Sequence, residues 1–370
     1  MIAVLFFNVS YLALLLWWAS GWRKLLSPGQ KLQLMPAKVP FVSVVVAFRN
    51  EERNLSALLQ SLQNQSWPSA GCEFIFVDDH SSDDSVRILM EVDDSRLHVV
   101  HLADDQHGKK AALHCGINRA RGEWILTTDA DCRLHADWIS SMVNYGVELN
   151  AEMVCGLVAS DTDGSFLFRF QSMEIAMLQV SGAGSLAGGF PLLNTGASLA
   201  FRKEAWVKVS GYSSHLSIAS GDDTFLMLDF QKAFPGKVRP LIVAAAVART
   251  VPLRSLMQVI QQRLRWMGKT RHYKPSFIHL SGSVIVLAAV TLIAYFFCTL
   301  SGHGYGLLLC ALFLARLISE FHILRLWKIQ SGQVFSFPES AMMSFLYPFF
   351  MLAIFMTGLF ARGRWRGRDL

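Results

Sequence analysis

The sequence lacks the short signatures of several common enzyme classes. G-x-G-x-x-G, P-loop and G-x-S-x-G motifs are missing from the strand-and-helix contexts that each requires, which argues against the usual dinucleotide, NTP and α/β-hydrolase sites. No internal repeat is visible, which argues against a secondary transporter. The six cysteines contain no C-x-x-C pair, so we expect free thiols in a reducing compartment. The histidines have no fixed ligand spacing, so we expect surface or packing roles for them.

Charge is missing from the start of the chain. Residues 1–20 carry no charged side chain, and Trp17 and Trp18 lie near their end, as is typical of a membrane-spanning helix with aromatic residues at the interface. A cleaved signal peptide usually has a basic start, whereas here the basic residues follow the apolar run. We therefore predict an N-terminal transmembrane anchor over residues 1–22 and a basic linker over residues 23–40, with the following chain in the cytoplasm.

The apolar and basic residues are distributed unevenly. Hydrophobic residues make up 52% of the chain and are concentrated at its two ends. Lys and Arg number 34 against 28 Asp and Glu, a net charge of +6, and much of the surplus flanks the apolar segments. Such flanks fit anionic lipid headgroups better than nucleic acid. We therefore predict an integral protein of the cell or inner membrane, with membrane lipids and no nucleic acid as partners.

The middle of the chain alternates between β and α patterns. Continuous apolar strands are predicted at residues 41–48, 72–79, 97–102 and 123–132, with helices at residues 50–65, 85–92 and 109–120 between them. Unbroken apolar strands separated by helices predict an α/β domain with a Rossmann-like, mainly parallel sheet that is covered on both faces. In such sheets, ligands bind at the carboxyl ends of the strands.

The rest of the chain returns towards a membrane pattern. Residues 159–252 have a mixed pattern, and residues 253–275 form a basic amphipathic helix typical of the membrane interface. Residues 276–361 are a membrane region with about three hydrophobic segments, and residues 362–370 are a basic tail. Arg316 and Glu320 are spaced to pair on one helix face. Counting crossings places the basic tail outside, against the positive-inside rule. Either the last segment re-enters around Pro348 or one assignment is wrong.

Two carboxylates end the last predicted strand of the α/β pattern. Asp129 and Asp131 are separated by one residue, and in an extended segment residues i and i+2 point the same way. Mg²⁺ and Mn²⁺ prefer carboxylate oxygens and often share their shell with substrate phosphates. The pair therefore predicts a divalent-metal site. The alternative is an Asp-rich turn whose side chains accept nearby backbone N–H groups.

Further motifs accompany this pair in a fixed order. They are VVVAFRNEE (Val44–Glu52), FVDDHSSDDS (Phe76–Ser85), GKKAAL (Gly108–Leu113), LTTDADC (Leu126–Cys132), GDD (Gly221–Asp223) and QQRLRW (Gln261–Trp266). Together they resemble family 2 glycosyltransferases with the GT-A fold, and the last motif is similar to the Gln-x-x-Arg-Trp signature of membrane-embedded polysaccharide synthases. The resemblance implies a GT-A domain over residues 41–275, with a nucleotide-sugar half at residues 41–158 and an acceptor half at residues 159–252. Transmembrane helices at both ends also suit lipid glycosyltransferases.

The resemblance implies a donor site for a nucleotide-diphosphate sugar, with UDP as the expected nucleotide. Asn50 and Glu51 would border the nucleobase, although they could also begin a helix. Asp78 or Asp79 would accept an N–H of uracil; the alternative is that they cap a turn. Lys109 or Lys110 would approach the base or the diphosphate; the alternative is an exposed, solvated pair. A divalent cation, Mg²⁺ or Mn²⁺, held by Asp129 and Asp131 would neutralise the diphosphate.

The resemblance also implies inversion at the anomeric carbon, which requires a base on the acceptor hydroxyl. Asp223 is the predicted base, with Asp222 as its neighbour; the alternative is that both begin a helix. The remaining residues implied in substrate binding are Gly196, in a loop that approaches the acceptor, and the motif residues Gln262, Arg265 and Trp266. Arg265 would bind diphosphate, and Trp266 would stack on the acceptor sugar. An interfacial helix would also account for these last three.

The leading interpretation is a membrane-bound inverting glycosyltransferase that acts on a polysaccharide or a lipid-linked acceptor. A non-catalytic membrane scaffold that uses a nucleotide-sugar-binding domain as a sensor is the rival. A sensor would have no use for the predicted base, which favours the enzyme.

Overall fold

The computed structural model describes residues 1–26, 39–213, 222–270, 272–274, 276–302, 304, 306–360, 364–365 and 368–369. Much of the predicted basic linker, most of the basic tail and Gly221 of the GDD motif lie outside these residues. The chain divides into two compact units. The sheet unit comprises Leu25–Asp161 and Leu193–Val251, and the helical unit comprises Met1–Lys24, Thr162–Leu192 and Pro252–Leu370.

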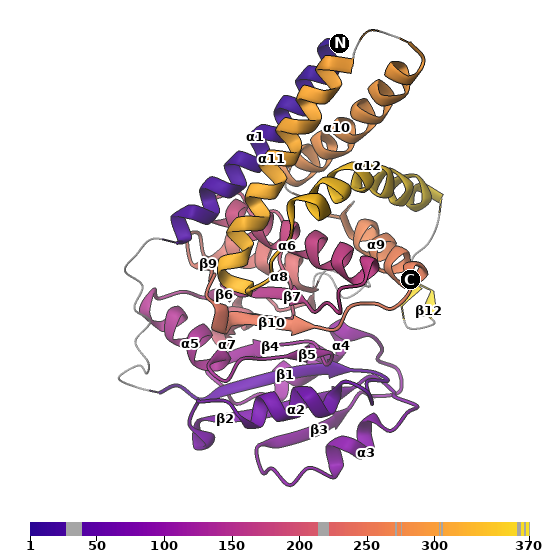
Figure 1. Cartoon of the computed structure of the whole chain (residues 1–370). Coiled ribbons are helices and arrows are strands. Elements are labelled where there is room, and N and C mark those ends of the chain that lie inside the picture. Colours follow the sequence, from indigo (N-terminus) through magenta and orange to yellow (C-terminus); the bar gives the residue numbers. More distant parts are fainter. Residues whose placement is uncertain are drawn as a thin grey trace. The chain divides into compact units, whose positions relative to one another are not determined.

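A seven-stranded sheet forms the centre of the sheet unit (Figure 1). Its order is β3 (Leu97–His101), β2 (Cys72–Asp78), β1 (Val42–Phe48), β4 (Trp124–Thr127), β8 (Leu199–Arg202), β6 (Met153–Cys155) and β9 (Val238–Pro240). The first four strands are mutually parallel, and β6 is parallel to β9. Only β8 among the sheet's strands runs antiparallel to its neighbours, β4 and β6. The predicted α/β class with a mainly parallel sheet is confirmed.

Helices of the sheet unit pack on this sheet through apolar faces. They are α2 (Leu55–Gln63), α3 (Ser85–Met90), α4 (Lys109–Arg119), α5 (Trp138–Glu148), α7 (Lys203–Lys208), α8 (Asp222–Ala233) and the short η1 (Ser69–Gly71) and η3 (Ala244–Ala246). Leu55, Leu58 and Leu62 of α2 are buried, as their helical spacing predicts. Helix α4 lies so close to the sheet that a Cβ at Gly116 would be 2.5 Å from a side-chain carbon of Val45. This close packing fixes the start of α4 beside the strand ends.

A second, three-stranded sheet has the order β5 (Cys132–Arg133), β10 (Val247–Thr250) and β7 (Leu157–Ser160). Strand β5 directly follows the Asp129–Asp131 segment and pairs antiparallel with β10, which places Thr250 opposite Cys132. Strand β10, which comes late in the sequence of the sheet unit, therefore lies beside the predicted metal-binding residues.

The helical unit contains α1 (Ile2–Leu25), α6 (Phe166–Ala187), α9 (Leu256–Thr270), α10 (Ser276–Leu300), α11 (Gly306–Ser331) and α12 (Phe337–Phe360), with the short strands β11 (Arg364–Trp365) and β12 (Arg368–Asp369). Among the described residues, α1, α10, α11 and most of α12 are long and apolar enough to cross a membrane. Helix α12 continues through Pro348. Residues 162–192 group with these helices, whereas the sequence pattern had placed residues 159–252 together.

Polar and small residues join the helices of this unit. Arg316 and Glu320 pair at 2.8 Å, as their spacing predicts, and Tyr11 of α1 donates to Glu320 at 2.7 Å. Helix α1 also crosses α6 at glycines, since a Cβ at Gly184 would lie 2.2 Å from the carbonyl oxygen of Trp18. Close backbone approach at small residues is a usual way for membrane helices to pack. In Figure 1, α1 and α11 lie side by side, consistent with this polar contact.

Candidate active site

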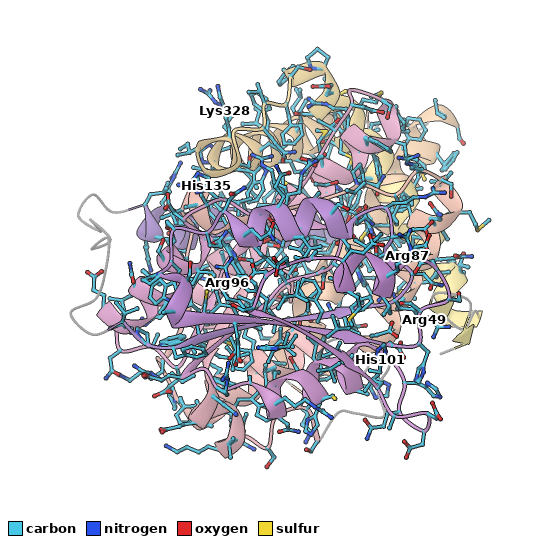
Figure 2. All side chains as sticks on the ribbon, turned by 90° about the horizontal axis from the view of Figure 1, so that it is seen from below. Arg49, Arg87, Arg96, His101, His135 and Lys328 are labelled. Atoms are coloured by element: carbon cyan, nitrogen blue, oxygen red, sulfur yellow. The ribbon has the colours of Figure 1, made fainter. Side chains whose placement is uncertain are left out.

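The polar residues of the sheet unit gather at one edge of the main sheet. Because β1, β2, β3 and β4 are parallel and adjacent, their carboxyl ends meet at the same edge. Figure 2 shows Arg49, just after β1, and His101, at the end of β3, on one side of this unit, and Arg96, just before β3, on the other. The side of Arg49 and His101 is therefore the carboxyl edge, where the sequence predicts the ligand.

Asp129 and Asp131 leave β4 at this edge and are held from different directions. Lys109 Nζ, at the start of α4, donates to Asp129 Oδ1 at 2.6 Å. Thr250 Oγ1, at the end of β10, donates to Asp131 Oδ2 at 3.2 Å. Asp131 is partly exposed and closely surrounded by protein, and this burial, with the nearby charge of Asp129, raises its pKa to about 6. The two carboxylates therefore repel each other when both are ionised.

This donor set fits a hard divalent cation. Two carboxylates with one threonine hydroxyl nearby supply the oxygen chemistry that Mg²⁺ and Mn²⁺ prefer. Burial raises the pKa of Asp131 most, and the charge of Asp129 raises it further, so the two ionised carboxylates repel each other in a poorly solvated place. A positive ion would relieve that repulsion. In a simple Asp-rich turn the side chains would accept nearby backbone N–H groups. Asp131 instead contacts the Thr250 hydroxyl and the Cys132 thiol.

Asn50 and Glu51 shape the loop after β1. Asn50 has a φ of 53°, in the left-handed region, and its Oδ1 accepts the backbone N–H of Ser82 at 2.8 Å. The backbone N–H of Glu51 donates to Ser85 Oγ at 2.7 Å. The loop after β1 is thus joined to the loop after β2. The helix α2 begins at Leu55 rather than at Asn50, so these two residues do not cap it directly.

Asp78 and Asp79 end β2 and have different neighbours. Asp78 Oδ1 accepts the backbone N–H of Ser81 at 2.9 Å, and His101 Nδ1 lies 3.2 Å from Asp78 Oδ2. Asp79 is only 1% exposed, and its Oδ2 lies 3.9 Å from Arg49 Nη1. Asp78 therefore stabilises a turn, whereas Asp79 lies beside the arginine that follows β1.

The two predicted lysines point to different places. Lys109 contacts Asp129, as described above. Lys110 is only 5% exposed, and its Nζ lies 5.1 Å from the centre of the Phe225 ring on α8. Lys109 therefore reaches the carboxylate pair, and Lys110 packs against the helix that carries the predicted base.

Asp223 is connected to the end of β4 through the Gly196 loop. The backbone N–H of Gly196 donates to Asp223 Oδ2 at 3.2 Å, and Thr127 Oγ1 donates to the Gly196 carbonyl at 2.9 Å. Thr127 is the last residue of β4 and lies shortly before Asp129. The structure thus brings together three segments that the sequence predicted separately: the Asp129 turn, the Gly196 loop and the start of α8.

Other predicted residues are less closely placed. Asp222 begins α8, and its side chain lies outside the described part of the chain. Gln262, Arg265 and Trp266 lie on α9 and belong to the helical unit. Their roles remain predictions.

Sequence reasoning missed residues that pair only in three dimensions. Thr250 and Thr127 make the contacts given above. Thr250 lies in none of the quoted motifs, and Thr127 lies in LTTDADC but was given no role. His107 was expected to be a surface or packing residue. With His80 it joins Asp79 in a cluster whose candidate ligand atoms lie within 4.8 Å of one another. Their ring centres are 4.8 Å apart. Only the fold brings their two loops together.

Comparisons with known proteins agree with this fold. The model of the Glycosyl transferase family 2 matches residues 43–206. A mannosyltransferase from Pyrobaculum calidifontis, solved with GDP-mannose and Mn²⁺, has a TM-score of 0.64 at 18% identity, covering 97% of this chain and 98% of that one. This likeness shows a shared fold.

Curated relatives match over about a third of this chain. An undecaprenyl-phosphate 4-deoxy-4-formamido-L-arabinose transferase from Pseudomonas fluorescens is 32% identical over 38% of this chain and 42% of its own length. A beta-monoglucosyldiacylglycerol synthase from Trichormus variabilis is 34% identical over 30% of this chain and 24% of its own. Glycosyltransferase AglE from Haloferax volcanii is 29% identical over 31% of this chain and 40% of its own. The chain thus spans less than half the length of these relatives. Its residues 43–206 are similar to glycosyltransferase family 2, and it shares the fold of the mannosyltransferase.

Proposed function

We propose that this protein is a membrane-bound inverting glycosyltransferase. It moves a sugar from a nucleotide-diphosphate donor to a lipid or glycan acceptor. The family 2 domain, the polar edge of the sheet and the long apolar helices support this proposal together. The sheet unit faces the cytoplasm, where nucleotide sugars are made, in agreement with the basic residues after the first apolar segment.

The donor lies across the carboxyl ends of β1, β2 and β4. Its nucleobase contacts the loops that Asn50 and Glu51 join, and the buried Asp79 accepts an N–H of the base. Arg49, beside Asp79 at 3.9 Å, provides a planar cation that stacks on the base. The diphosphate extends towards Asp129, where Lys109 supplies a positive charge. Uracil is the base we favour, because its N–H matches a carboxylate acceptor.

Asp129 and Asp131 hold the divalent cation. When bound, it offsets the charge of the leaving diphosphate as a Lewis acid. The hydroxyl of Thr250 orients the Asp131 carboxylate, and the ammonium group of Lys109 partly neutralises the Asp129 carboxylate. The mannosyltransferase of similar fold contains Mn²⁺, which supports a divalent ion here.

Transfer occurs in a single displacement at the anomeric carbon. Asp223 accepts the proton of the acceptor hydroxyl as its oxygen forms the new glycosidic bond. The bond from the anomeric carbon to the diphosphate oxygen breaks, and its electron pair leaves with the nucleoside diphosphate. Attack opposite the leaving group inverts the configuration. The Gly196 N–H keeps one oxygen of Asp223 directed towards its own loop.

The observation that carries this proposal is the continuous contact from Asp223 to β4. Asp223 contacts Gly196, and Gly196 contacts Thr127, at 3.2 and 2.9 Å. A base that belonged to an unrelated surface would have no reason to share a loop with the strand that carries the metal-binding pair. The same contact counts against a sensor that lacks catalysis.

The acceptor is a lipid or a lipid-linked glycan. Two curated relatives are named for lipid substrates, and few apolar helices are available for a wide polymer channel. Gln262, Arg265 and Trp266 on α9 take part in binding the acceptor. A growing polysaccharide is the second acceptor class, which the same Gln-x-x-Arg-Trp motif favours.

The test is to incubate membranes that contain the protein with radiolabelled UDP and GDP sugars and with Mg²⁺ or Mn²⁺. Label that enters the organic phase from a UDP sugar, in a metal-dependent way, is the expected result. Label in an insoluble polymer would identify the other acceptor class. Donor binding without transfer to any acceptor would contradict the enzyme and favour a sensor.

A further inference from the structure

Helix α9 carries a buried cation on the face that packs inside the helical unit. Arg263 is 5% exposed and lies within the Gln262-x-x-Arg265-Trp266 motif, at a position that the motif does not specify. Removing a guanidinium from water is costly unless it is paired and hydrogen-bonded. The contacts of Arg263 therefore need an explanation.

The partner of Arg263 is Glu174 on α6, which is 4% exposed. Arg263 Nε and Nη2 donate to Glu174 Oε2 at 2.9 and 2.5 Å. Tyr347 of α12 donates to the other oxygen, Oε1, at 3.3 Å. Both oxygens of Glu174 are thus engaged, and the pair joins three helices of the same unit.

The rest of the Arg263 guanidinium contacts the motif itself. Its centre lies 4.2 Å from the centre of the Trp266 ring, which is a cation–π contact. Its Nη1 donates to Oε1 of Gln262. One fixed guanidinium therefore sets the direction of both the indole ring and the amide of the motif.

A buried ion pair is a weak source of stability, because apolar side chains of similar size often serve as well. Its advantage is fixed geometry, since a planar guanidinium allows few arrangements of its partners. We propose that Glu174 and Arg263 are positioning residues for the acceptor: Glu174 fixes Arg263, and Arg263 holds Gln262 and Trp266 in the orientation that binds it. This inference rests on the proposed function, which assigns Gln262 and Trp266 to the acceptor.

The test compares Glu174→Gln and Arg263→Lys with the unchanged full chain in detergent. Undecaprenyl phosphate is the lipid probe, and a UDP sugar with Mn²⁺ is the donor. Glu174→Gln removes the charge at constant size, and Arg263→Lys keeps the charge but removes the planar fork. In both variants we expect the KM for the lipid probe to rise about tenfold or more. The KM for the donor should stay within about twofold of the wild-type value, because the donor binds the sheet unit.

A matched control is available on the same helix. Arg169 of α6 pairs with Glu339 of α12 at 2.6 Å, without touching α9. Glu339→Gln should lower the thermal unfolding temperature but leave the KM for the lipid probe unchanged. An unchanged KM in both Glu174→Gln and Arg263→Lys would overturn the inference, and so would an equal rise of KM in Glu339→Gln.

A second measurement separates this inference from the proposed function. If the wild-type protein transfers no sugar to the probe, the proposed function fails for that acceptor, and a thermal double-mutant cycle decides the positioning role. Glu174→Gln and Trp266→Leu should then lower the unfolding temperature non-additively. The fall in the double variant should be smaller, by at least about 2 °C, than the sum of the falls in the two single variants. Additive shifts would show that Glu174 does not act on Trp266.

Discussion

The hydroxyl of Thr127 offers a selective perturbation of the proposed active site. It donates to the Gly196 carbonyl at 2.9 Å in a buried position, and the same glycine donates to Asp223. Thr127→Val keeps the shape of the side chain but leaves this carbonyl without its donor. An unsatisfied buried carbonyl costs about 1–3 kcal/mol, which corresponds to a fall in unfolding temperature of roughly 2–10 °C for a domain of this size.

The same substitution should slow sugar transfer. The Gly196 loop would move away from β4 and carry Asp223 with it, and a misplacement of about 1 Å can cost up to about a hundredfold in rate. We expect kcat to fall about tenfold or more, with little change in the KM for the donor. Thr127→Ser is the matched control, because it keeps the hydroxyl and should retain most of the activity. If Thr127→Val unfolds and turns over like the wild type, the contact does not position Asp223.

Three further predictions concern charge and packing. Asp131→Asn should stabilise the metal-free protein at pH 8 but not near pH 3, because burial raises the folded-state pKa of Asp131 from 3.8 to about 6. Between these two pKa values the unfolded state loses a proton that the folded state keeps, so the wild type loses about 1–2 kcal/mol of stability over this range as pH rises, after allowance for solvent screening. Thermal unfolding in EDTA at the two pH values measures this difference. Lys109→Met should weaken donor binding about tenfold, because the substitution removes a cation 2.6 Å from Asp129 at the proposed diphosphate position. Calorimetry with Mn²⁺ present would measure the affinity, and an unchanged affinity would favour a purely structural lysine. Gly184→Leu should destabilise the helical unit by about 1–3 kcal/mol or more, because even a Cβ at this position would lie 2.2 Å from the Trp18 carbonyl oxygen. An unchanged unfolding temperature in detergent would show that α1 does not cross α6 at this point.

The sequence pattern was sufficient for the parallel half of the sheet. The strands predicted at residues 41–48, 72–79 and 97–102 match β1, β2 and β3 to within about one residue at each end. The runs of β1 and β2 are almost continuously apolar because these strands are buried, which is a local signal, whereas β3 at the edge of the sheet is only partly buried. The predicted carboxyl-edge position of Asp79 and Asp129 followed from their place at the ends of predicted parallel strands.

Pairing between distant segments was beyond local patterns. Strand β8 inserts antiparallel between β4 and β6, and no periodicity reveals which neighbours a strand selects. Thr250 reaches Asp131 only because β10 pairs with β5. The grouping of residues 162–192 with the apolar helices has the same cause, since long-range contacts decide it. The Glu174–Arg263 pair likewise depends on contact between separate helices.

The central claim, that one centre holds the donor through a divalent ion and activates the acceptor through Asp223, is tested most directly by measuring donor binding and sugar transfer in the same two variants. Asp223→Asn should bind a UDP sugar with Mn²⁺ as the wild type does, yet transfer about a hundredfold to ten-thousandfold more slowly. Asp131→Asn should lose both properties. Near-normal transfer by Asp223→Asn, or normal metal-dependent binding by Asp131→Asn, would contradict the account.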